Sequence, residues 1–297
     1  MTDQTAAPGR LPGFIVIGAM KSGTSSLRDY LRGHPEVYIP PDEELHYFAE
    51  AINWKQGVDW YRARFADAGD AIAVGEKSPT YTMHPEHPGV PERIHDLLPD
   101  VRLIYVVRHP IQRIKSHYVH QFGRGHEANP IRRAVREDPR YLDTTRYAMQ
   151  LQRYLDHFPR EQILIVTSEG LKFDRRATVQ RVYDFLGVDS SHLPDVLATE
   201  FYQTARRRTY PPALLWARRL AKRHMLQGER AKVLVESMLA RGTSEGRMPT
   251  AAGTPDAGEP SHVLAPGLQR RLADLLRDDV ARFARHMPAD FDGWGLT

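Results

Sequence analysis

The chain of 297 residues contains no cysteine. Without thiols it can form no disulfide and no thiolate nucleophile, and it lacks the commonest ligand of structural zinc sites. It also has no apolar run near the roughly 18–20 residues of a membrane-spanning helix, and no basic region precedes its short N-terminal apolar stretch. We therefore expect a cytoplasmic protein with no membrane partner.

A large excess of either charge is also absent. The sequence has 41 lysines and arginines against 37 aspartates and glutamates, a net charge of +4. This small excess suits an anionic ligand but does not require a nucleic-acid partner. Apolar residues make up 41 % of the chain, enough for the core of one large domain. We expect residues 1–297 to form a single domain, with a flexible N-terminus at 1–12 and a mobile loop at 242–267.

Short apolar runs alternate with helical patterns along the chain. The runs predict strands at residues 14–17, 71–74, 103–107 and 163–166. Helices are predicted at residues 25–32, 58–66, 91–98, 110–121, 143–157, 175–186, 206–240 and 268–287, and a helical insert or flap at 123–143. This alternation predicts an α/β fold: a P-loop-like central parallel sheet flanked by helices on both faces, with ligands at the carboxyl ends of the strands.

The first predicted strand leads into a loop of small residues and then a helix. The loop runs from Gly18 to Gly23, which is the spacing of a nucleoside-triphosphate P-loop. A P-loop continues with lysine and a hydroxyl residue that binds magnesium, whereas here Thr24 and Ser25 follow and the lysine is Lys21. Backbone amides at such a turn favour an anion. The segment therefore predicts a loop for a phosphate-like group without a magnesium partner, and an ordinary strand–turn–helix corner is the alternative.

A second segment offers side chains for an anion. The predicted strand at 103–107 is followed by Arg108, His109 and Pro110, and proline is typical of the first helical position. Arg108 would project from the carboxyl end of the strand, with Ser116 about two turns into the next helix. A guanidinium binds phosphate through paired hydrogen bonds, and a serine hydroxyl adds a neutral donor. No aspartate closes this strand, so it is a poor magnesium-binding strand for an ATPase.

Residues 21–26 and 108–116 together resemble the two cofactor signatures of sulfotransferases that use 3′-phosphoadenosine 5′-phosphosulfate (PAPS). The resemblance continues through residues 43–48, 76–81, 146–151 and 158–166. In order and spacing, these motifs are similar to the heparan-sulfate type of sulfotransferase domain and its bacterial relatives. The similarity covers roughly residues 13–190, and the final third of the chain matches weakly.

The resemblance implies roles for particular residues. The loop around Lys21 would bind the 5′-phosphosulfate, Arg108 and Ser116 would bind the 3′-phosphate, and Lys77 would be a second cation near the transferred group. The implied cofactor-binding residues are Lys21, Ser22, Gly23, Thr24, Ser25, Ser26, Arg108 and Ser116. PAPS is then a co-substrate, and no metal is expected.

Glu44 matches the glutamate that acts as the base in this family, and His46 is the reserve base. A carboxylate can take an acceptor proton if desolvation raises its pKa, although an acidic turn of this kind is usually just solvated. The implied reaction is in-line transfer of a sulfuryl group to a hydroxyl or amine of a small-molecule or carbohydrate acceptor, with Lys21 and Lys77 stabilising the charge. His109 and His117 flank the phosphate site and are expected to be structural.

Two other functions fit parts of the pattern. A P-loop nucleotide kinase would need the lysine–hydroxyl pair and the strand-end aspartate that this sequence lacks. A non-catalytic protein that binds an anion or RNA could use the basic helix at 206–240, but it would not need Glu44, Lys77 and Arg108 in family order. The chain also departs from Golgi relatives, whose domains carry a disulfide. The resemblance therefore does not identify the acceptor, and nothing in the sequence indicates the oligomeric state.

Overall fold

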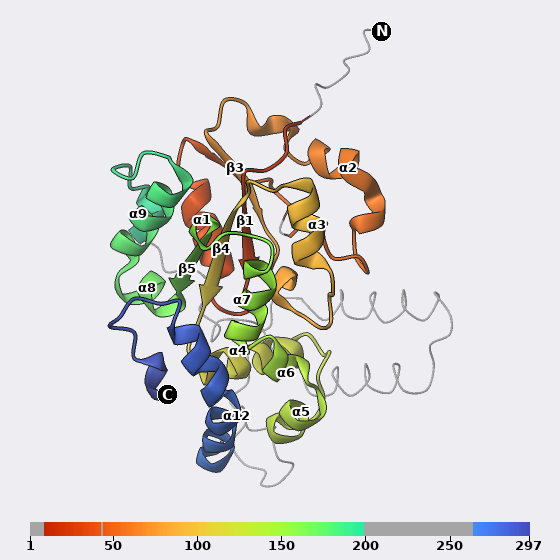
Figure 1. The fold of residues 1–297 in the computed structure, drawn as a ribbon, viewed down its shortest axis with the longest axis vertical. Helices are drawn as coiled ribbons and strands as arrows, with labels where there is room; N and C mark the ends of the chain where they lie inside the picture. The colour runs from red at the N-terminus through yellow and green to blue at the C-terminus, as the bar shows by residue number, and fades with distance from the viewer. Residues whose placement is uncertain (1–8, 43, 199–263) are drawn as a thin grey trace, which may run out of the picture.

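The computed structural model describes residues 9–42, 44–198 and 264–297, which form a five-stranded sheet in the order β2-β3-β1-β4-β5 (Figure 1). The strands are β1 (Phe14–Gly18), β2 (Val37–Tyr38), β3 (Ala73–Lys77), β4 (Arg102–Val107) and β5 (Ile163–Thr167). All four neighbouring pairs are parallel. The predicted α/β fold with a central parallel sheet is therefore confirmed.

Helices connect the strands. The α-helices are α1 (Thr24–Arg32), α2 (Gly57–Ala63), α3 (Val90–Leu97), α4 (Pro110–Gly123), α5 (Ile131–Glu137), α6 (Arg140–Asp143), α7 (Tyr147–Leu155), α8 (Ser168–Phe173), α9 (Arg175–Leu186) and α12 (Pro266–Ala284). Short 3-10 helices are η1 (Trp54–Gln56), η2 (Ala66–Ala68), η3 (Pro79–Thr82), η4 (Arg160–Gln162), η5 (Asp195–Ala198) and η7 (Gly293–Gly295). Within the described ranges, no helix has both the length and the apolar character that crossing a bilayer requires.

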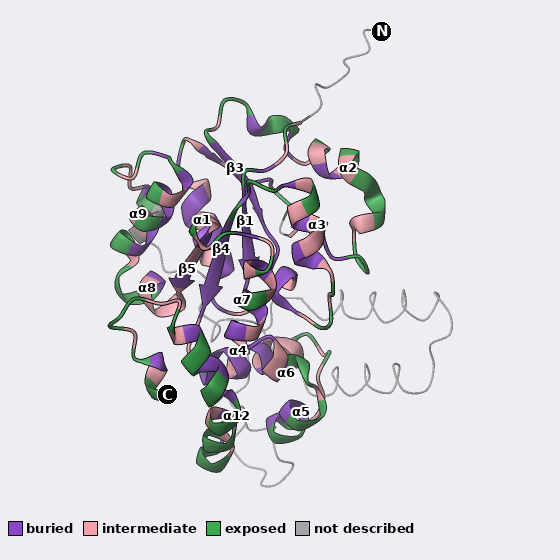
Figure 2. Cartoon of the chain, viewed as in Figure 1, coloured by how far each residue is buried: buried purple, intermediate pink, exposed green. Residues whose placement is uncertain are grey.

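Both faces of the sheet are covered, because successive strand side chains point to opposite sides. Ile15 and Ile17 pack in one core with residues of α2, α3, α7 and α12. Phe14 and Val16 pack in a second core with residues of α1, α8 and α9. None of these four side chains is more than 1 % exposed, and Figure 2 shows the central strands buried along their length. A parallel sheet buried on both faces explains the continuous apolar runs in the sequence.

A third core lies beyond the ends of the strands, among α4, α5, α6 and α12 (Figure 1). Ile131 of α5 and Tyr141 of α6 are both buried there. The prediction of a helical insert at 123–143 is therefore confirmed.

The predicted strand at 71–74 is displaced, since β3 is Ala73–Lys77. Its end carries Glu76 and Lys77, which are 1 % and 2 % exposed, and charged residues are rare in a buried strand. Its middle is Gly75, where a Cβ atom would lie 2.5 Å from the ring of Phe14. The hydrophobic pattern misses the end of this strand, because Glu76 and Lys77 are polar residues whose buried contacts are described below.

The predicted helix at 143–157 is confirmed as α7, which is shorter at both ends. In the connection from α6 to α7, the Thr145 hydroxyl donates to the Tyr141 carbonyl oxygen at 2.6 Å. The predicted loop at 242–267 is wrong at its last two residues, because α12 begins with proline at Pro266. The basic helix predicted at 206–240, most of that loop and residues 1–8 lie outside the described residues.

The C-terminal helix is joined to the sheet layer by a buried carboxylate. Asp279 of α12 is 4 % exposed and accepts hydrogen bonds from the backbone amides of Ala148 (2.9 Å) and Met149 (3.1 Å). These amides belong to the first turn of α7, where no backbone acceptor exists within the helix. Asp279 therefore caps α7 from another helix.

We predict that Asp279→Ala will lower the free energy of unfolding by about 1–2 kcal/mol, the usual cost of losing a helix cap. Urea unfolding followed by circular dichroism measures this change. Asp278→Ala removes the same charge from an exposed position on the same helix and should be near neutral. Equal losses in the two variants would contradict the capping role.

Candidate functional site

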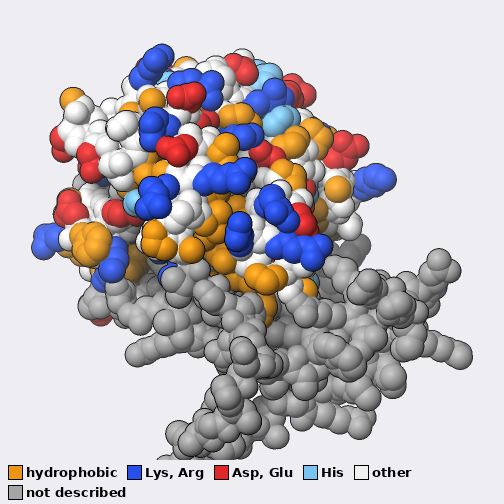
Figure 3. Space-filling model, turned by 90° about the horizontal axis from the view of Figure 1, so that it is seen from below, with side chains coloured by type: hydrophobic (Ala, Val, Ile, Leu, Met, Phe, Trp, Pro, Cys, Tyr) orange, Lys and Arg blue, Asp and Glu red, His pale blue; other side chains and the backbone are white. Residues whose placement is uncertain are grey.

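Three cations lie at the carboxyl edge of the sheet. Lys77 ends β3, Lys21 lies in the loop after β1, and Arg108 directly follows β4. These three strands are neighbours in the order β3-β1-β4, so their ends meet at one edge. Figure 3 views the molecule from below Figure 1, the side towards which these strands run, and lysine and arginine side chains gather there among hydrophobic ones. The structure thus brings together the cations that the sequence places in three separate motifs.

The loop after β1 depends on glycine. Gly18 has a φ of 154°, and a Cβ atom there would lie 1.9 Å from the Thr82 hydroxyl. Gly23 adopts a left-handed conformation with a φ of 98° and precedes the first residue of α1, Thr24. The amides of the first turn of α1 therefore open towards the loop. A loop of this shape, with a lysine at its centre, can hold an anion.

Arg108 is held through its backbone. Its carbonyl oxygen accepts a hydrogen bond of 2.7 Å from the Tyr147 hydroxyl of α7. The next residue, His109, caps α4 by accepting the Ile111 amide on Nδ1 at 3.2 Å, and its own amide donates to Glu169 at 3.0 Å. Burial lowers the pKa of His109, which favours the neutral ring that a cap requires. His109 is thus structural here, as predicted.

Ser116 lies on α4 and is 6 % exposed. Its hydroxyl has no hydrogen-bond partner within the described residues. A buried polar atom without a partner is costly to the folded protein. The position therefore fits a ligand that supplies the missing acceptor.

Lys77 and Glu44 form a close ion pair. Lys77 Nζ lies 2.6 Å from Glu44 Oε1 and 3.4 Å from the Ser25 hydroxyl, and the lysine side chain is fully buried. The other carboxylate oxygen of Glu44 lies 3.1 Å from Nε2 of His46. Glu44, the predicted base, therefore contacts both Lys77 and the reserve base His46.

The pKa of Glu44 reflects these contacts. Burial alone would raise it, but the hydrogen bond from His46 and the charge of Lys77 outweigh burial and lower it to about 2. Because this folded-state pKa is below the ordinary value of 4.5, the ionised carboxylate stabilises the fold above that value. The stabilisation is lost as the pH falls towards 2.

His46 is fixed at both ring nitrogens and at its backbone. Nδ1 lies 2.9 Å from the Thr80 hydroxyl, and the His46 amide donates to the Ser78 hydroxyl at 2.9 Å. The residue has a φ of 50°, a left-handed conformation that costs energy for a residue with a side chain. These bonds hold the imidazole against Glu44.

Beneath this cluster lies Glu76, a buried carboxylate to which the sequence analysis gave no role. It accepts hydrogen bonds from the hydroxyls of Tyr61 (2.7 Å), Ser78 (2.7 Å) and Tyr81 (3.0 Å). Burial raises the pKa of Glu76, and the three donors act in the opposite direction. Its place in the motif 76–81, which also contains Ser78 and Tyr81, was the available signal, but the bond from Tyr61 could not be recognised without the fold.

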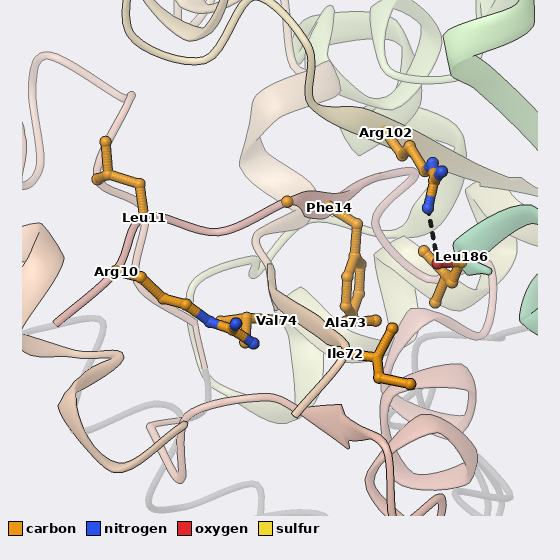
Figure 4. Close-up of a pocket in the computed structure, with 9 residues that line it drawn as sticks. Arg10, Leu11, Phe14, Ile72, Ala73, Val74, Arg102 and Leu186 are labelled. Carbon is orange, nitrogen blue, oxygen red and sulfur yellow. Dashed lines mark hydrogen bonds between the residues drawn. The ribbon is translucent and has the colours of Figure 1, made fainter. Parts of the chain in front are cut away.

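A pocket with a volume of about 190 Å³ lies at the other edge of the sheet. Its lining includes Phe14, Ala73 and Arg102, the first residues of β1, β3 and β4, together with Arg10 (Figure 4). Arg102 donates to the Leu186 carbonyl oxygen at 2.6 Å, the bond drawn in Figure 4. This pocket is at the amino ends of the strands, away from the cationic edge.

Comparisons with known proteins agree with this arrangement. Human heparan sulfate glucosamine 3-O-sulfotransferase 6 is 31 % identical over 300 residues, which cover 98 % of this chain and 76 % of the relative. Mouse heparan sulfate glucosamine 3-O-sulfotransferase 5 is 31 % identical over 192 residues, 60 % of this chain and 54 % of the relative. The chain thus spans about three quarters of the first relative and about half of the second.

Solved structures share the fold. A sulfotransferase from Alicyclobacillus acidocaldarius matches with a TM-score of 0.67 and 25 % identity, covering 96 % of this chain and 99 % of that one. Mouse sulfotransferase SULT7A1 complexed with PAP matches in fold, with a TM-score of 0.50 and 13 % identity over 98 % of this chain and 89 % of that one.

A family model described as "Sulfotransferase domain" matches residues 11–210, more than half of the chain. This range contains the loop after β1, the Lys77–Glu44 pair and the Arg108–Ser116 segment. The chain therefore belongs to the sulfotransferase family and is an enzyme of that class.

Proposed function

We propose that the enzyme transfers the sulfuryl group of PAPS to a hydroxyl or amine of a small-molecule or carbohydrate acceptor. The observation that carries this proposal is the meeting of three cations at one sheet edge, with Glu44 bonded to one of them, Lys77. Sulfuryl transfer needs positive charge on the moving group and on the leaving phosphate, and it needs a base for the acceptor proton. These are the groups that the edge supplies.

The donor would be held at both of its anionic ends. Lys21 and the amides of residues 22–26, at the start of α1, suit the 5′-phosphosulfate. Arg108 and the Ser116 hydroxyl suit the 3′-phosphate, the group that distinguishes PAPS from ordinary adenine nucleotides. The solved relative complexed with PAP supports a donor of this type.

Glu44 would act as the base. Its carboxylate takes the acceptor proton as the acceptor oxygen or nitrogen bonds to sulfur and the bond from sulfur to the 5′-phosphate breaks. In the free enzyme, the pKa of about 2 makes Glu44 a weak proton acceptor. If Lys77 turns from Glu44 to the developing charge on the transferred group, the carboxylate loses its cation and its pKa rises. The pair would thereby couple proton removal to sulfuryl transfer.

His46 is better placed to orient Glu44 than to replace it. In its neutral form, Nε2 donates to Glu44 and Nδ1 accepts from the Thr80 hydroxyl. Both nitrogens are therefore engaged, so His46 must give up a partner before it can take an acceptor proton. It stays the alternative base.

Two relatives are named for sulfation of heparan sulfate glucosamine. Their names support a carbohydrate hydroxyl as the first acceptor to screen. Family membership favours sulfuryl transfer over a nucleotide kinase and over RNA binding. A cytoplasmic location and a reaction without metal stay predictions.

We predict that PAP, the desulfonated product, will raise the unfolding temperature in the presence of EDTA, because it binds only the folded state. Arg108→Ala should remove most of this shift, since the 3′-phosphate loses its charge-assisted partner. Differential scanning fluorimetry with PAP, or with ATP and magnesium, measures both effects.

Arg102→Ala is the matched control, because Arg102 lies at the opposite end of the same strand. It should keep the PAP-dependent shift even if its own unfolding temperature changes. If ATP with magnesium stabilises the protein as well as PAP does, the donor assignment is wrong.

Lys77→Ala and Lys21→Ala should lower turnover more than they weaken PAP binding, because their charges matter most when negative charge builds on the leaving phosphate. Steady-state transfer rates and PAP titration calorimetry separate the two quantities. Lys55→Ala, at an exposed position in η1, should leave both unchanged. Wild-type turnover in both test variants would place the two lysines outside the transfer site.

Glu44→Gln should cut transfer by roughly a hundredfold or more while PAP affinity and fold are kept, since the amide retains shape but cannot take a proton. Radiolabelled transfer to the acceptor measures the loss. Glu50→Gln, which changes an exposed carboxylate nearby in sequence, should have no effect.

The pH profile separates the two candidate bases. Because the pKa of Glu44 is about 2 in the free enzyme, Glu44 should produce no acid limb in kcat/KM between about pH 5 and 7. A small loss in Glu44→Gln with an inactive His46→Ala would move the base to His46. An acid limb in kcat/KM between about pH 5 and 7 that persists in Glu44→Gln would also identify His46 as the base.

A further inference from the structure

Arg113 of α4 is a fully buried arginine, 0 % exposed, between the two residues assigned to the 3′-phosphate. Its Nε donates to the Thr145 hydroxyl at 2.8 Å, and Nη2 donates to the Tyr141 carbonyl oxygen at 2.7 Å. Its Nη1 donates to the Met20 carbonyl oxygen at 3.3 Å. Nη2 also lies 3.4 Å from Nδ1 of His117. The side chain therefore joins α4, the connection from α6 to α7, and the loop after β1.

All four of these partners are neutral, and no carboxylate lies within ion-pair distance of Arg113 among the described residues. Burial and the charge of Arg113 hold the pKa of His117 well below its usual value, so the ring stays neutral. Burial lowers the pKa of Arg113 to about 10, and Arg108 acts in the same direction. Arg113 is thus charged at neutral pH. A buried charge without an opposite partner is costly to the folded protein.

The buried charge of Arg113 lies next to the proposed donor site. Met20 immediately precedes Lys21, so Arg113 touches the backbone of the loop assigned to the 5′-phosphosulfate. On α4, Ser116 lies three residues after Arg113 and therefore on a neighbouring part of the helix surface. The guanidinium thus contacts the loop assigned to the 5′-phosphosulfate and belongs to the helix that carries Ser116.

We propose that Arg113 is a positioning residue that locks the loop after β1 to α4 and that its buried charge is balanced by the anionic donor when the donor binds. This inference rests on the proposed function, because the balancing anion is the PAPS or PAP of that reaction. The free enzyme carries the cost of the unbalanced cation, and donor binding relieves it.

The proposal separates Arg113 from an ordinary buried arginine. A residue that only supports packing would, when replaced, destabilise the free enzyme and leave the donor affinity of the folded protein unchanged. A residue that also holds charge for an anion would, when replaced, weaken donor binding by the folded protein. Donor affinity, and not the stability of the free enzyme, is therefore the quantity that separates the two roles.

Arg113→Gln is the first test. PAP affinity, measured by titration calorimetry, should fall by roughly thirtyfold, the scale of a charge acting at an effective dielectric constant of about 20. The unfolding temperature without PAP checks that the variant is folded. Arg176→Gln makes the same charge change at an exposed position of α9 and should alter neither quantity.

Arg113→Lys is the second test and decides the matter if Arg113→Gln does not fold. A buried lysine loses its proton at lower pH than an exposed one. The ratio of its Kd for PAP to the wild-type Kd should therefore rise between about pH 6 and 9.

Other titratable side chains around position 113 do not produce this change. They are His117 on α4, Tyr105 on β4, Tyr141 on α6 and Tyr147 on α7. Burial raises the tyrosine pKa values and lowers that of His117, so these groups keep their charge state over this range.

The outcomes are distinguishable. If the wild type does not bind PAP, the proposed function and this inference fall together. If the wild type binds PAP but Arg113→Gln binds it equally well, the inference alone is overturned. It is also overturned if the Kd ratio of Arg113→Lys is flat across the pH range.

Discussion

The candidate site depends on the parallel pairing of β3, β1 and β4. Parallel strands place all their carboxyl ends at one edge, so residues that follow different strands become neighbours without any contact in sequence. Pairing of Val16 with Lys77, and of Gly18 with Tyr105, fixes how far each strand extends towards that edge. A shift of one residue in either register would move a cation away from the others and turn its side chain to the other face.

Burial of charge at this edge is the second constraint. Lys77 is covered on all sides and has Glu44 as its counter-ion. Glu76, one residue earlier in the same strand, is satisfied by three hydroxyl donors and not by a cation. Arg113 has only neutral partners. The buried groups are therefore balanced in different ways, by a counter-ion, by hydroxyl donors or by neutral acceptors.

Much of this could be predicted from the sequence. Apolar runs located β1, β4 and β5 to within about two residues, because strands buried on both faces read as continuous hydrophobic segments. The loop glycines and Arg108 were recognisable because each belongs to a short motif. The location of β3 was wrong by two residues at its start, since Glu76 and Lys77 are polar residues whose burial depends on partners elsewhere in the chain.

The contacts that join motifs could not be predicted. The distance between Lys77 and Glu44, and the bond from Arg113 to Met20, exist only after the chain has folded. Local patterns specify which side chains are available, whereas tertiary packing decides which of them meet.

The cap that Asp279 places on α7 has a consequence for where this protein can be divided. The match to the family model ends at residue 210, yet α7, which Asp279 caps, presents Tyr147, whose hydroxyl holds the backbone of Arg108. Phe283 and Trp294 also pack against the ring of Tyr147, at centroid distances of 5.5 and 5.8 Å. Residues 264–297 therefore pack directly against the helix that supports the cationic edge of the sheet. A fragment that ended at residue 210 would retain every signature residue. It would lack the C-terminal residues that support Tyr147, which in turn holds the backbone of Arg108.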